Sequence, residues 1–194
     1  MEELQKAIKI MRDGGIVIFP TDTAFGIGCR IDREESVKRL FELRKRPYDK
    51  ATPVLTASLK MIEPYLKPVP EEVTTKLVKP YWPGGVTIVM QCITEKVPEL
   101  ISGGRGTLGV RIPDHPQTLQ LIEGVGVPII GTSANFSGEA TPFTFESLDK
   151  DLVSSVDFVL KGECFAREVS TVIDTTVSPW KILRSGVVKI PVTQ

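Results

Sequence analysis

The sequence predicts an α/β protein, and three observations support this class. Short apolar runs typical of buried strands alternate along the chain with segments whose apolar residues recur at helical spacing. Two of the runs, IVIF at 16–19 and PIIGT at 128–132, are each followed by small hydroxyl, amide or carboxylate side chains. No internal repeat or long linker divides the chain, so we expect one domain spanning 1–194.

Composition points to an ordinary folded protein with reduced cysteines. Hydrophobic residues make up 41% of the chain and charged residues 25%, and the net charge of +0 argues against a protein that coats polyanions. Three widely separated cysteines and the single His115 argue against a disulfide frame or a Cys/His zinc site. The first residues do not resemble a signal peptide, and no apolar run is long enough to cross a membrane. We therefore expect a cytoplasmic enzyme or binding domain.

The elements of the first half follow from periodicity and capping. Amphipathic spacing indicates a helix over about the first twelve residues, and Gly14-Gly15 stops it. Asp32 with Glu35 resembles a capping box, so a second helix is expected to begin there and to end in the basic run 44–46 before Pro47. The other predicted elements are strands at 16–19, 24–28, 53–57 and 86–93, a short helix capped by Ser58, and a helix over 70–79 that Pro80 closes.

The second half alternates in the same way. A strand at 107–112 carries Arg111 among apolar neighbours, and because an unpaired buried charge is costly, its guanidinium must meet a protein carboxylate or an anionic ligand. His115 lies in a turn between two prolines, where we expect a surface residue rather than a catalytic base. The other predicted elements are helices at 117–123 and 146–153, strands at 128–132 and 156–160, and paired closing strands at 170–174 and 180–184.

Charged and hydroxyl side chains near the predicted strand ends form a set suited to binding anions. The cations are Arg44, Arg46, Lys50, Arg111 and Arg184, and the neutral polar residues are Thr23, Thr107, Ser133, Asn135 and Ser170. Thr-Asp-Thr after a strand is by itself typical of a turn, so the case depends on the whole set. No GxSxG elbow, HExxH pair or GxxxxGK[ST] loop is present. Nucleotidyl transfer by positioning and charge stabilisation fits this set better than hydrolysis or redox chemistry.

Six motifs occur in the order found in the YrdC/Sua5 family. They are PTDTAFGIG, RKRPYDK, GVRIPDHP, TSANFSG, STVID and ILRSG, and the resemblance runs from about Ile16 to Val188. Each motif alone is weak, but six in order are specific. The resemblance implies a YrdC-like α/β fold, with a twisted mixed sheet, flanking helices and a large basic concave cavity. It also implies the short YrdC-like form of the family, without the Sua5 C-terminal domain.

The activity that this resemblance implies is that of an L-threonylcarbamoyladenylate synthase, a nucleotidyltransferase. L-Threonine, bicarbonate and ATP would give threonylcarbamoyl-AMP and pyrophosphate, for the N6-threonylcarbamoyl modification of adenosine 37 in tRNAs. Mg²⁺ is expected with the triphosphate, held mainly by phosphate oxygens and waters. Besides these substrates, the expected partners are a downstream threonylcarbamoyl-transferase machinery and, weakly, RNA, with no membrane.

The resemblance also assigns roles to residues, motif by motif. The implied threonine contacts are Thr23, Arg111, Ser133 and Ser170, and the implied ATP contacts are Arg46, Lys50, Thr107, Asn135 and Arg184. The family usually has Lys-x-Arg at 44–46, so Arg44 and Lys45 are both candidates for the lysine's part, and Thr144 is a candidate for one more nucleotide contact. The threonine amine needs a proton acceptor, which the sequence does not name.

Two other functions stay open at this stage. An RNA- or tRNA-binding module of the same fold would grip phosphates with the basic cluster Arg39, Arg44, Lys45, Arg46 and Lys50. Zero net charge and the lack of interleaved aromatic residues argue against that as the main role. A carbamoyladenylate-forming domain, as in hydrogenase maturation, would instead use another carbamoyl substrate.

Overall fold

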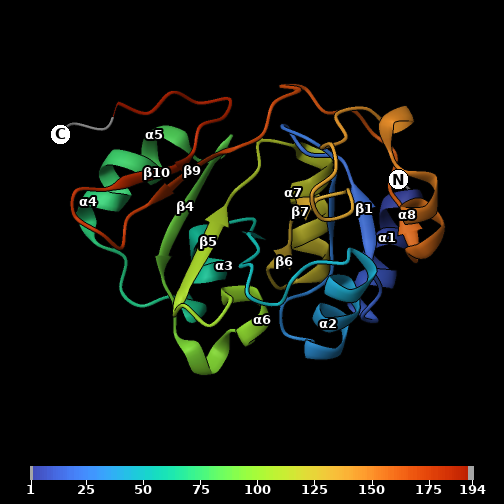
Figure 1. Ribbon diagram of the computed structural model, residues 1–194, viewed down its shortest axis with the longest axis horizontal. Coiled ribbons are helices and arrows are strands. Elements are labelled where there is room, and N and C mark those ends of the chain that lie inside the picture. Colours follow the sequence, from blue (N-terminus) through green and yellow to red (C-terminus); the bar gives the residue numbers. More distant parts are fainter. Residues whose placement is uncertain (1, 192–194) are drawn as a thin grey trace.

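The computed structural model describes residues 2–191, and its architecture confirms the predicted α/β class. The strands form two mixed sheets with helices packed around them (Figure 1). One sheet has the strand order β7-β2-β1-β8, and the other has the order β10-β9-β4-β5-β3-β6. The mixed sheet expected from the sequence is therefore divided into two, and the division falls between β6 and β7, at Gly131.

The four-stranded sheet is built around β1 (Val17–Phe19), whose residues are all buried, as its unbroken apolar run predicts. β2 (Gly26–Gly28) pairs antiparallel with β1, and β8 (Phe158–Val159) pairs parallel to it. β7 (Thr132–Ser133) pairs antiparallel with β2. On this side of the molecule, α1 (Glu2–Arg12) packs beside α7 (Pro116–Val125) (Figure 1).

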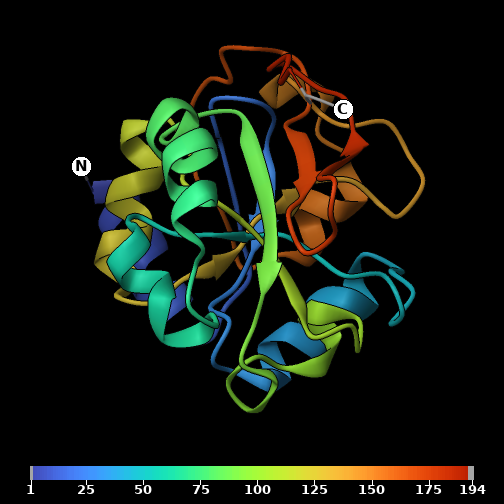
Figure 2. The same cartoon turned by 90° about the vertical axis from the view of Figure 1, so that its left-hand side faces the viewer.

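The six-stranded sheet separates a core face from an open face. Its strands are β10 (Lys181–Arg184), β9 (Thr171–Asp174), β4 (Val86–Gln91), β5 (Thr107–Arg111), β3 (Val54–Leu55) and β6 (Ile129–Ile130). The β9–β4 and β5–β3 pairs are parallel, and the other three pairs are antiparallel. Because side chains alternate along a strand, Ile88 lies in the core while Thr87 and Val89 face the opposite side. Figure 2 shows β4 between the 71–81 helical segment and the β9–β10 pair.

Two predicted helix ends were wrong. α2 (Glu34–Leu43) begins after Arg33 without a side-chain cap, because the Asp32 carboxylate accepts two hydrogen bonds from the Arg30 guanidinium, at 2.5 and 2.7 Å. The predicted helix over 70–79 does not stop at Pro80. It continues as α4 (Glu71–Val73), a π-helical turn (Thr74–Val78) and α5 (Lys79–Tyr81). The turn before Pro80 is π-helical, with hydrogen bonds between residues five apart, and Pro80 lies in the first turn of α5, where its missing N–H is tolerated.

The remaining helices are short. Ser58 caps α3 (Leu59–Ile62) as predicted, since its Oγ accepts a hydrogen bond from the Met61 amide at 3.2 Å. The predicted helix over 146–153 is replaced by a 3-10 turn (Phe145–Ser147) and α8 (Lys150–Ser155), because the Asp149 carboxylate caps a new helix start. The sequence did not predict α6 (Glu99–Ser102) or the 3-10 turns Glu63–Tyr65 and Thr94–Lys96.

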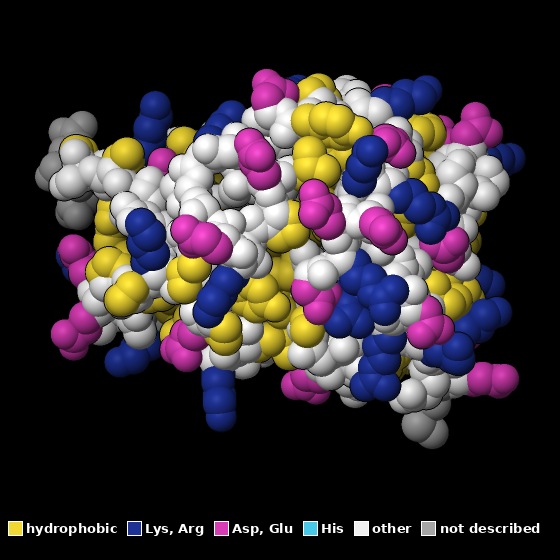
Figure 3. All heavy atoms as spheres, turned by 90° about the horizontal axis from the view of Figure 1, so that it is seen from below, with side chains coloured by type: hydrophobic (Ala, Val, Ile, Leu, Met, Phe, Trp, Pro, Cys, Tyr) yellow, Lys and Arg dark blue, Asp and Glu magenta, His cyan; other side chains and the backbone are white. Residues whose placement is uncertain are grey.

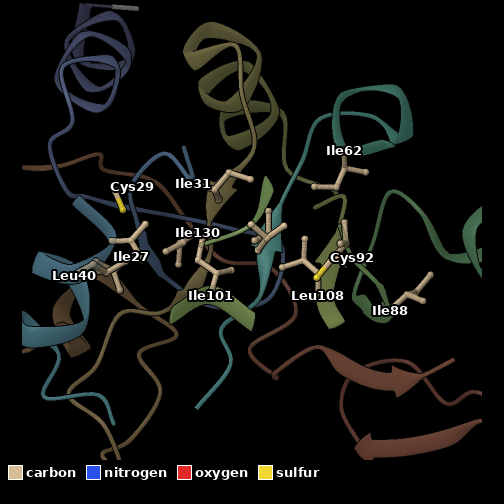
Figure 4. Close-up of a cluster of buried hydrophobic side chains, with 14 of the residues drawn as sticks. Ile27, Cys29, Ile31, Leu40, Ile62, Ile88, Cys92, Ile101, Leu108 and Ile130 are labelled. Atoms are coloured by element: carbon tan, nitrogen blue, oxygen red, sulfur yellow. The ribbon is translucent and has the colours of Figure 1, made fainter. Parts of the chain in front are cut away.

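One hydrophobic cluster joins the two sheets. It includes Ile27 of β2, Ile130 of β6 and Leu108 of β5 (Figure 4). Cys29 and Cys92 lie in the same cluster as buried free thiols. The expectation of one domain over 1–194 agrees with this shared core but stays a prediction. Within residues 2–191, no helix combines the length and the hydropathy that a membrane crossing requires.

We predict that Gly28→Ala strongly destabilises the fold. A Cβ at Gly28 would overlap the backbone carbonyl of Ile130 in the other sheet, and backbone cannot yield as a side chain can. Overpacking of this kind costs about 3 kcal/mol of the free energy of unfolding, which urea titration measures. Gly109→Ala is the control, since its nearest neighbour would be Thr87 Cγ2 at 3.4 Å, an ordinary contact. Equal stability of the two variants would contradict the prediction.

Candidate functional site

A cavity of about 500 Å³ is lined by residues of both sheets. Its floor is the open face of the six-stranded sheet, where alternate residues of three neighbouring strands face the same way. These floor residues are Thr87 and Val89 of β4, Thr107, Gly109 and Arg111 of β5, and Ser170, Val172 and Asp174 at and along β9. The chain from Thr21 to Gly26, the loop around Lys50, and Gly131 to Ser133 supply the other walls.

The structure brings most of the predicted site residues together. Among the cavity-lining residues are Thr23, Arg111, Ser133, Ser170, Arg46, Lys50, Thr107 and Arg184. The cavity is basic, because Arg105 adds a fifth cation and Asp174 is the one carboxylate among these lining residues. The proximity of these residues is therefore an observation, while the role of each toward threonine or ATP stays a prediction.

Arg111 is a buried cation whose partner the sequence left open. Its Nη2 donates to the Asp22 carboxylate, its Nη1 donates to Thr23 Oγ1 at 2.7 Å, and its Nε donates to the Gly84 carbonyl at 3.0 Å. Burial lowers the pKa of the guanidinium below its ordinary value, and the Asp22 charge opposes that shift. A guanidinium has five N–H groups, so these three bonds within residues 2–191 leave two N–H groups for a ligand.

Arg184 reaches the same floor from β10. Its Nε donates to the Ser170 carbonyl at 3.0 Å and its Nη2 to Ser170 Oγ at 2.9 Å. Burial lowers the pKa of Arg184, and the positive charge of Arg111 lowers it further. Two positively charged guanidinium groups close together repel each other. An anionic ligand bound between them would relieve that repulsion.

Arg46 shapes the part of the cavity wall that precedes β3. Its Nε donates to the Lys50 carbonyl at 3.2 Å, and its Nη2 donates to the Ala51 carbonyl. The Lys50 side chain is exposed and lines the cavity. Arg46 thus fixes the backbone that carries a second cation, while partial burial lowers its own pKa.

Asn135 and Arg44 are not among the residues that line the cavity, and their predicted roles toward ATP stay predictions. The Arg44 guanidinium, only 2% exposed, donates at 2.9 Å to the Asn135 carbonyl and at 2.9 Å to Thr132 Oγ1. The Asn135 amide in turn donates to the carbonyls of Phe136 and Glu139. Burial, and then the charge of Arg46, lower the pKa of Arg44 to about 10. Both side chains are therefore engaged in holding the 132–139 loop to the end of α2.

Lys45 and Thr144, the other two candidate contacts predicted from the sequence, also do not line the cavity. Lys45 is exposed, has a left-handed backbone with φ 50°, and places its ammonium 5.0 Å from the centre of the Phe136 ring. Thr144 caps the 3-10 turn through a reciprocal pair of hydrogen bonds with Ser147. Arg44 and Lys45 are the two candidates for the position where the family usually has a lysine. Of these, Arg44 is buried against Thr132 and Asn135 beside the cavity.

His115 is buried, not exposed as the sequence suggested. It is the N-cap of α7, where its Nδ1 accepts from the Thr118 amide at 3.3 Å. Its Nε2 lies 3.1 Å from the Glu163 carbonyl, and its ring stacks on Phe165 at 5.2 Å. The accepting role of Nδ1 requires a neutral ring with the proton on Nε2. His115 thereby ties the 161–168 loop to α7.

The residues predicted from the sequence do not include several that line the cavity. Thr87 and Asp174 could have been found from the two-residue period, which places them on the same face of their strands as Val89 and Ser170. Asp22 could not, because only the tertiary structure shows which carboxylate meets Arg111. Thr52 also lines the cavity, and its Oγ1 is the buried side-chain polar atom without a hydrogen-bond partner in the described part of the chain.

Residues 9–186 match the family model Sua5/YciO/YrdC, described as telomere recombination. The chain is 37% identical over 185 residues to a threonylcarbamoyl-AMP synthase of Pyrococcus abyssi, covering 95% of this chain and 54% of that protein. It is 30% identical over 190 residues to a threonylcarbamoyl-AMP synthase of Vibrio parahaemolyticus, covering 96% of this chain and 100% of that protein. The crystal structure of P. abyssi Sua5 complexed with L-threonine superposes with a TM-score of 0.89 at 38% identity, over 94% of this chain and 54% of that one. The chain thus spans about half the length of the Pyrococcus relative.

We predict that the stability of the protein falls as the pH drops through the histidine range. Burial lowers the pKa of His115 below its usual 6.5, so the unfolded state binds a proton more readily than the folded state. The stabilisation is complete above pH 6.5 and is lost as the pH falls toward the folded-state pKa. Urea midpoints at about pH 5 and pH 7.5 measure this difference. His115→Asn keeps an N-cap acceptor but cannot titrate, so an unchanged pH difference in that variant would contradict the assignment.

Proposed function

Because this chain belongs to the Sua5/YciO/YrdC family, we propose that it is an enzyme of the threonylcarbamoyl-AMP synthase type. L-Threonine, bicarbonate and ATP would be its substrates. The threonine amine and bicarbonate would form a carbamate with loss of water, and the final products would be threonylcarbamoyl-AMP, pyrophosphate and that water. The observation that carries the proposal is one basic cavity in which a guanidinium with spare donors lies among hydroxyl groups and further cations. Such a site binds a carboxylate and a polyphosphate side by side.

The amino-acid carboxylate is proposed to bind at Arg111. Two of its N–H groups are not used by residues 2–191, and a guanidinium is well shaped to donate two parallel hydrogen bonds to a carboxylate. Asp22 and Thr23 fix the orientation of this guanidinium before substrate arrives. Hydroxyl groups of Ser133 and Ser170 lie in the same cavity and can donate to the same substrate.

The triphosphate is proposed to bind among Arg46, Lys50 and Arg184, with Thr107 as a neutral contact. These cations would offset the charge that develops as pyrophosphate leaves. An oxygen of the threonine carbamate forms the new bond to the α-phosphorus, and the bond from that phosphorus to the pyrophosphate oxygen breaks. Positioning of the two substrates supplies most of the rate acceleration in such a reaction.

We propose Mg²⁺ as the metal that accompanies ATP. Among residues 2–191, no group of three or more His, Cys, Asp or Glu side chains could hold a metal ion alone. Asp174 fits a metal bound chiefly by phosphates, because Mg²⁺ commonly takes one carboxylate in addition to phosphate oxygens and waters. The Thr176 amide and hydroxyl both donate to Asp174 Oδ1, at 2.9 and 2.6 Å, and so orient the carboxylate.

The product is an activated mixed anhydride, so we propose that a threonylcarbamoyl transferase acting on tRNA in the cytoplasm consumes it. Direct RNA binding by this chain has less support. Figure 3 shows Lys and Arg side chains gathered on part of one face, with acidic side chains among them. The basic cluster predicted from the sequence is divided, because Arg44 is buried and Arg39 pairs with Asp157 at 2.6 Å. Weak RNA affinity stays a prediction.

The proposal is tested by incubating the purified protein with L-threonine, bicarbonate, ATP and Mg²⁺. Mass spectrometry is expected to detect threonylcarbamoyl-AMP, with one pyrophosphate released for each product molecule. Carbamoyl phosphate in place of threonine tests the hydrogenase-maturation type of chemistry. Pyrophosphate release only with carbamoyl phosphate would refute the proposed substrate, and salt-sensitive RNA binding without any ATP consumption would favour the RNA-binding alternative.

We predict that two arginine variants separate the substrates. Arg111→Ala should lower kcat/KM for threonine roughly 100-fold. The change removes the guanidinium that would bind the substrate carboxylate, and it leaves Asp22 buried without its cation. Arg46→Ala should instead raise the Kd of ATP about tenfold, as expected for one lost charged hydrogen bond. Steady-state kinetics and calorimetry measure these effects. Normal threonine kinetics in Arg111→Ala, or unchanged ATP affinity in Arg46→Ala, would remove that residue from the site.

A further inference from the structure

Thr87 is a cavity residue to which neither the sequence motifs nor the resemblance assigns a role. It lies on the floor, is 3% exposed, and has its Oγ1 3.0 Å from Ser170 Oγ. Thr87 pairs with Val172 of β9 on one side. On the other side, the Ile88–Val110 pair places Thr87 across from Arg111. Its hydroxyl has no other hydrogen-bond partner within residues 2–191.

The hydrogen bonds around Ser170 restrict where its proton can point. A serine hydroxyl has one proton and two lone pairs, and a guanidinium can only donate. Arg184 Nη2, at 2.9 Å, therefore occupies one lone pair of Ser170 Oγ. If Thr87 donates into the second lone pair, the Ser170 proton has no protein acceptor and must point into the cavity. A carboxylate bound at Arg111 would accept that proton and select this arrangement.

We infer that Thr87 is a positioning residue for the carboxylate of the amino-acid substrate. Its hydroxyl donates to Ser170 Oγ, and it thereby aims the Ser170 O–H at the carboxylate that the spare N–H groups of Arg111 bind. Donation from both Thr87 and Arg184 also polarises the Ser170 O–H and makes it a stronger donor. This inference rests on the proposed function, because it takes the substrate carboxylate to lie beside Arg111.

A purely structural role explains the Thr87–Ser170 bond less well. Backbone pairing from Val86 to Val89 with Thr171 to Asp174 already joins β4 to β9 without any side-chain link. Thr171, on the opposite face of β9, is a comparison residue whose hydroxyl has a structural role. It is 1% exposed, donates to the Val188 carbonyl at 2.6 Å, and does not line the cavity.

The test compares Thr87→Val, Thr87→Ser and the matched control Thr171→Val in the full chain. Thr87→Val should raise KM for threonine about fivefold, the usual effect of one neutral hydrogen bond, with little change in the Kd of ATP. Thr87→Ser should restore the wild-type KM, since it keeps the hydroxyl. Thr171→Val should lower the melting temperature and leave KM for threonine unchanged.

A double-mutant cycle with Ser170→Ala distinguishes positioning from structure. If Thr87 acts through the Ser170 hydroxyl, Thr87→Val should add no further rise in KM once that hydroxyl is gone. An unchanged KM in Thr87→Val, or an equal rise in the Ser170→Ala background, would overturn the inference while wild-type turnover upholds the proposed function. Wild-type protein that neither binds threonine in calorimetry nor forms product would overturn the proposed function and this inference with it.

Discussion

The buried guanidinium of Arg111 connects the two sheets across the cavity, and the arrangement of the site depends on it. Arg111 belongs to the six-stranded sheet, while its partners Asp22 and Thr23 follow β1 of the four-stranded sheet. A charge removed from water must be paired and hydrogen-bonded. The pairing demanded by burial therefore also sets the orientation in which Arg111 presents its remaining donors.

Arg44 makes a second connection of this kind, but with neutral partners. Its guanidinium holds the carbonyl of Asn135 and the hydroxyl of Thr132, and so fastens the loop after β7 to the end of α2. That loop continues from Ser133, which lines the cavity. The two buried arginines thus hold two neighbouring parts of the cavity wall, since Gly26 pairs with Ser133, while Lys50 is exposed and lines the cavity with its charge unburied.

The floor of the cavity follows from the geometry of a sheet covered on one face only. Ile88 and Val110 fill the core on one side, while Thr87, Gly109 and Arg111 occupy the other. Functional groups placed on a rigid floor keep their spacing when substrates enter, which is what catalysis by positioning requires. The fixed spacing of the strands therefore holds these groups in place better than a flexible loop could.

The sequence by itself determined the α/β class, most of the strands, and the set of cations and hydroxyls from which the site is built. The class and the strands follow from local periodicity, as in the apolar run that precedes Thr23. The cations and hydroxyls follow from residue chemistry, as for the isolated charge of Arg111. Only the tertiary structure decided that Asp22 pairs with Arg111, that Arg44 and Asn135 support the site without lining it, and that His115 is buried. Each of these depends on contacts between residues far apart in the chain, and periodicity carries no information about which distant partner a buried polar group will meet.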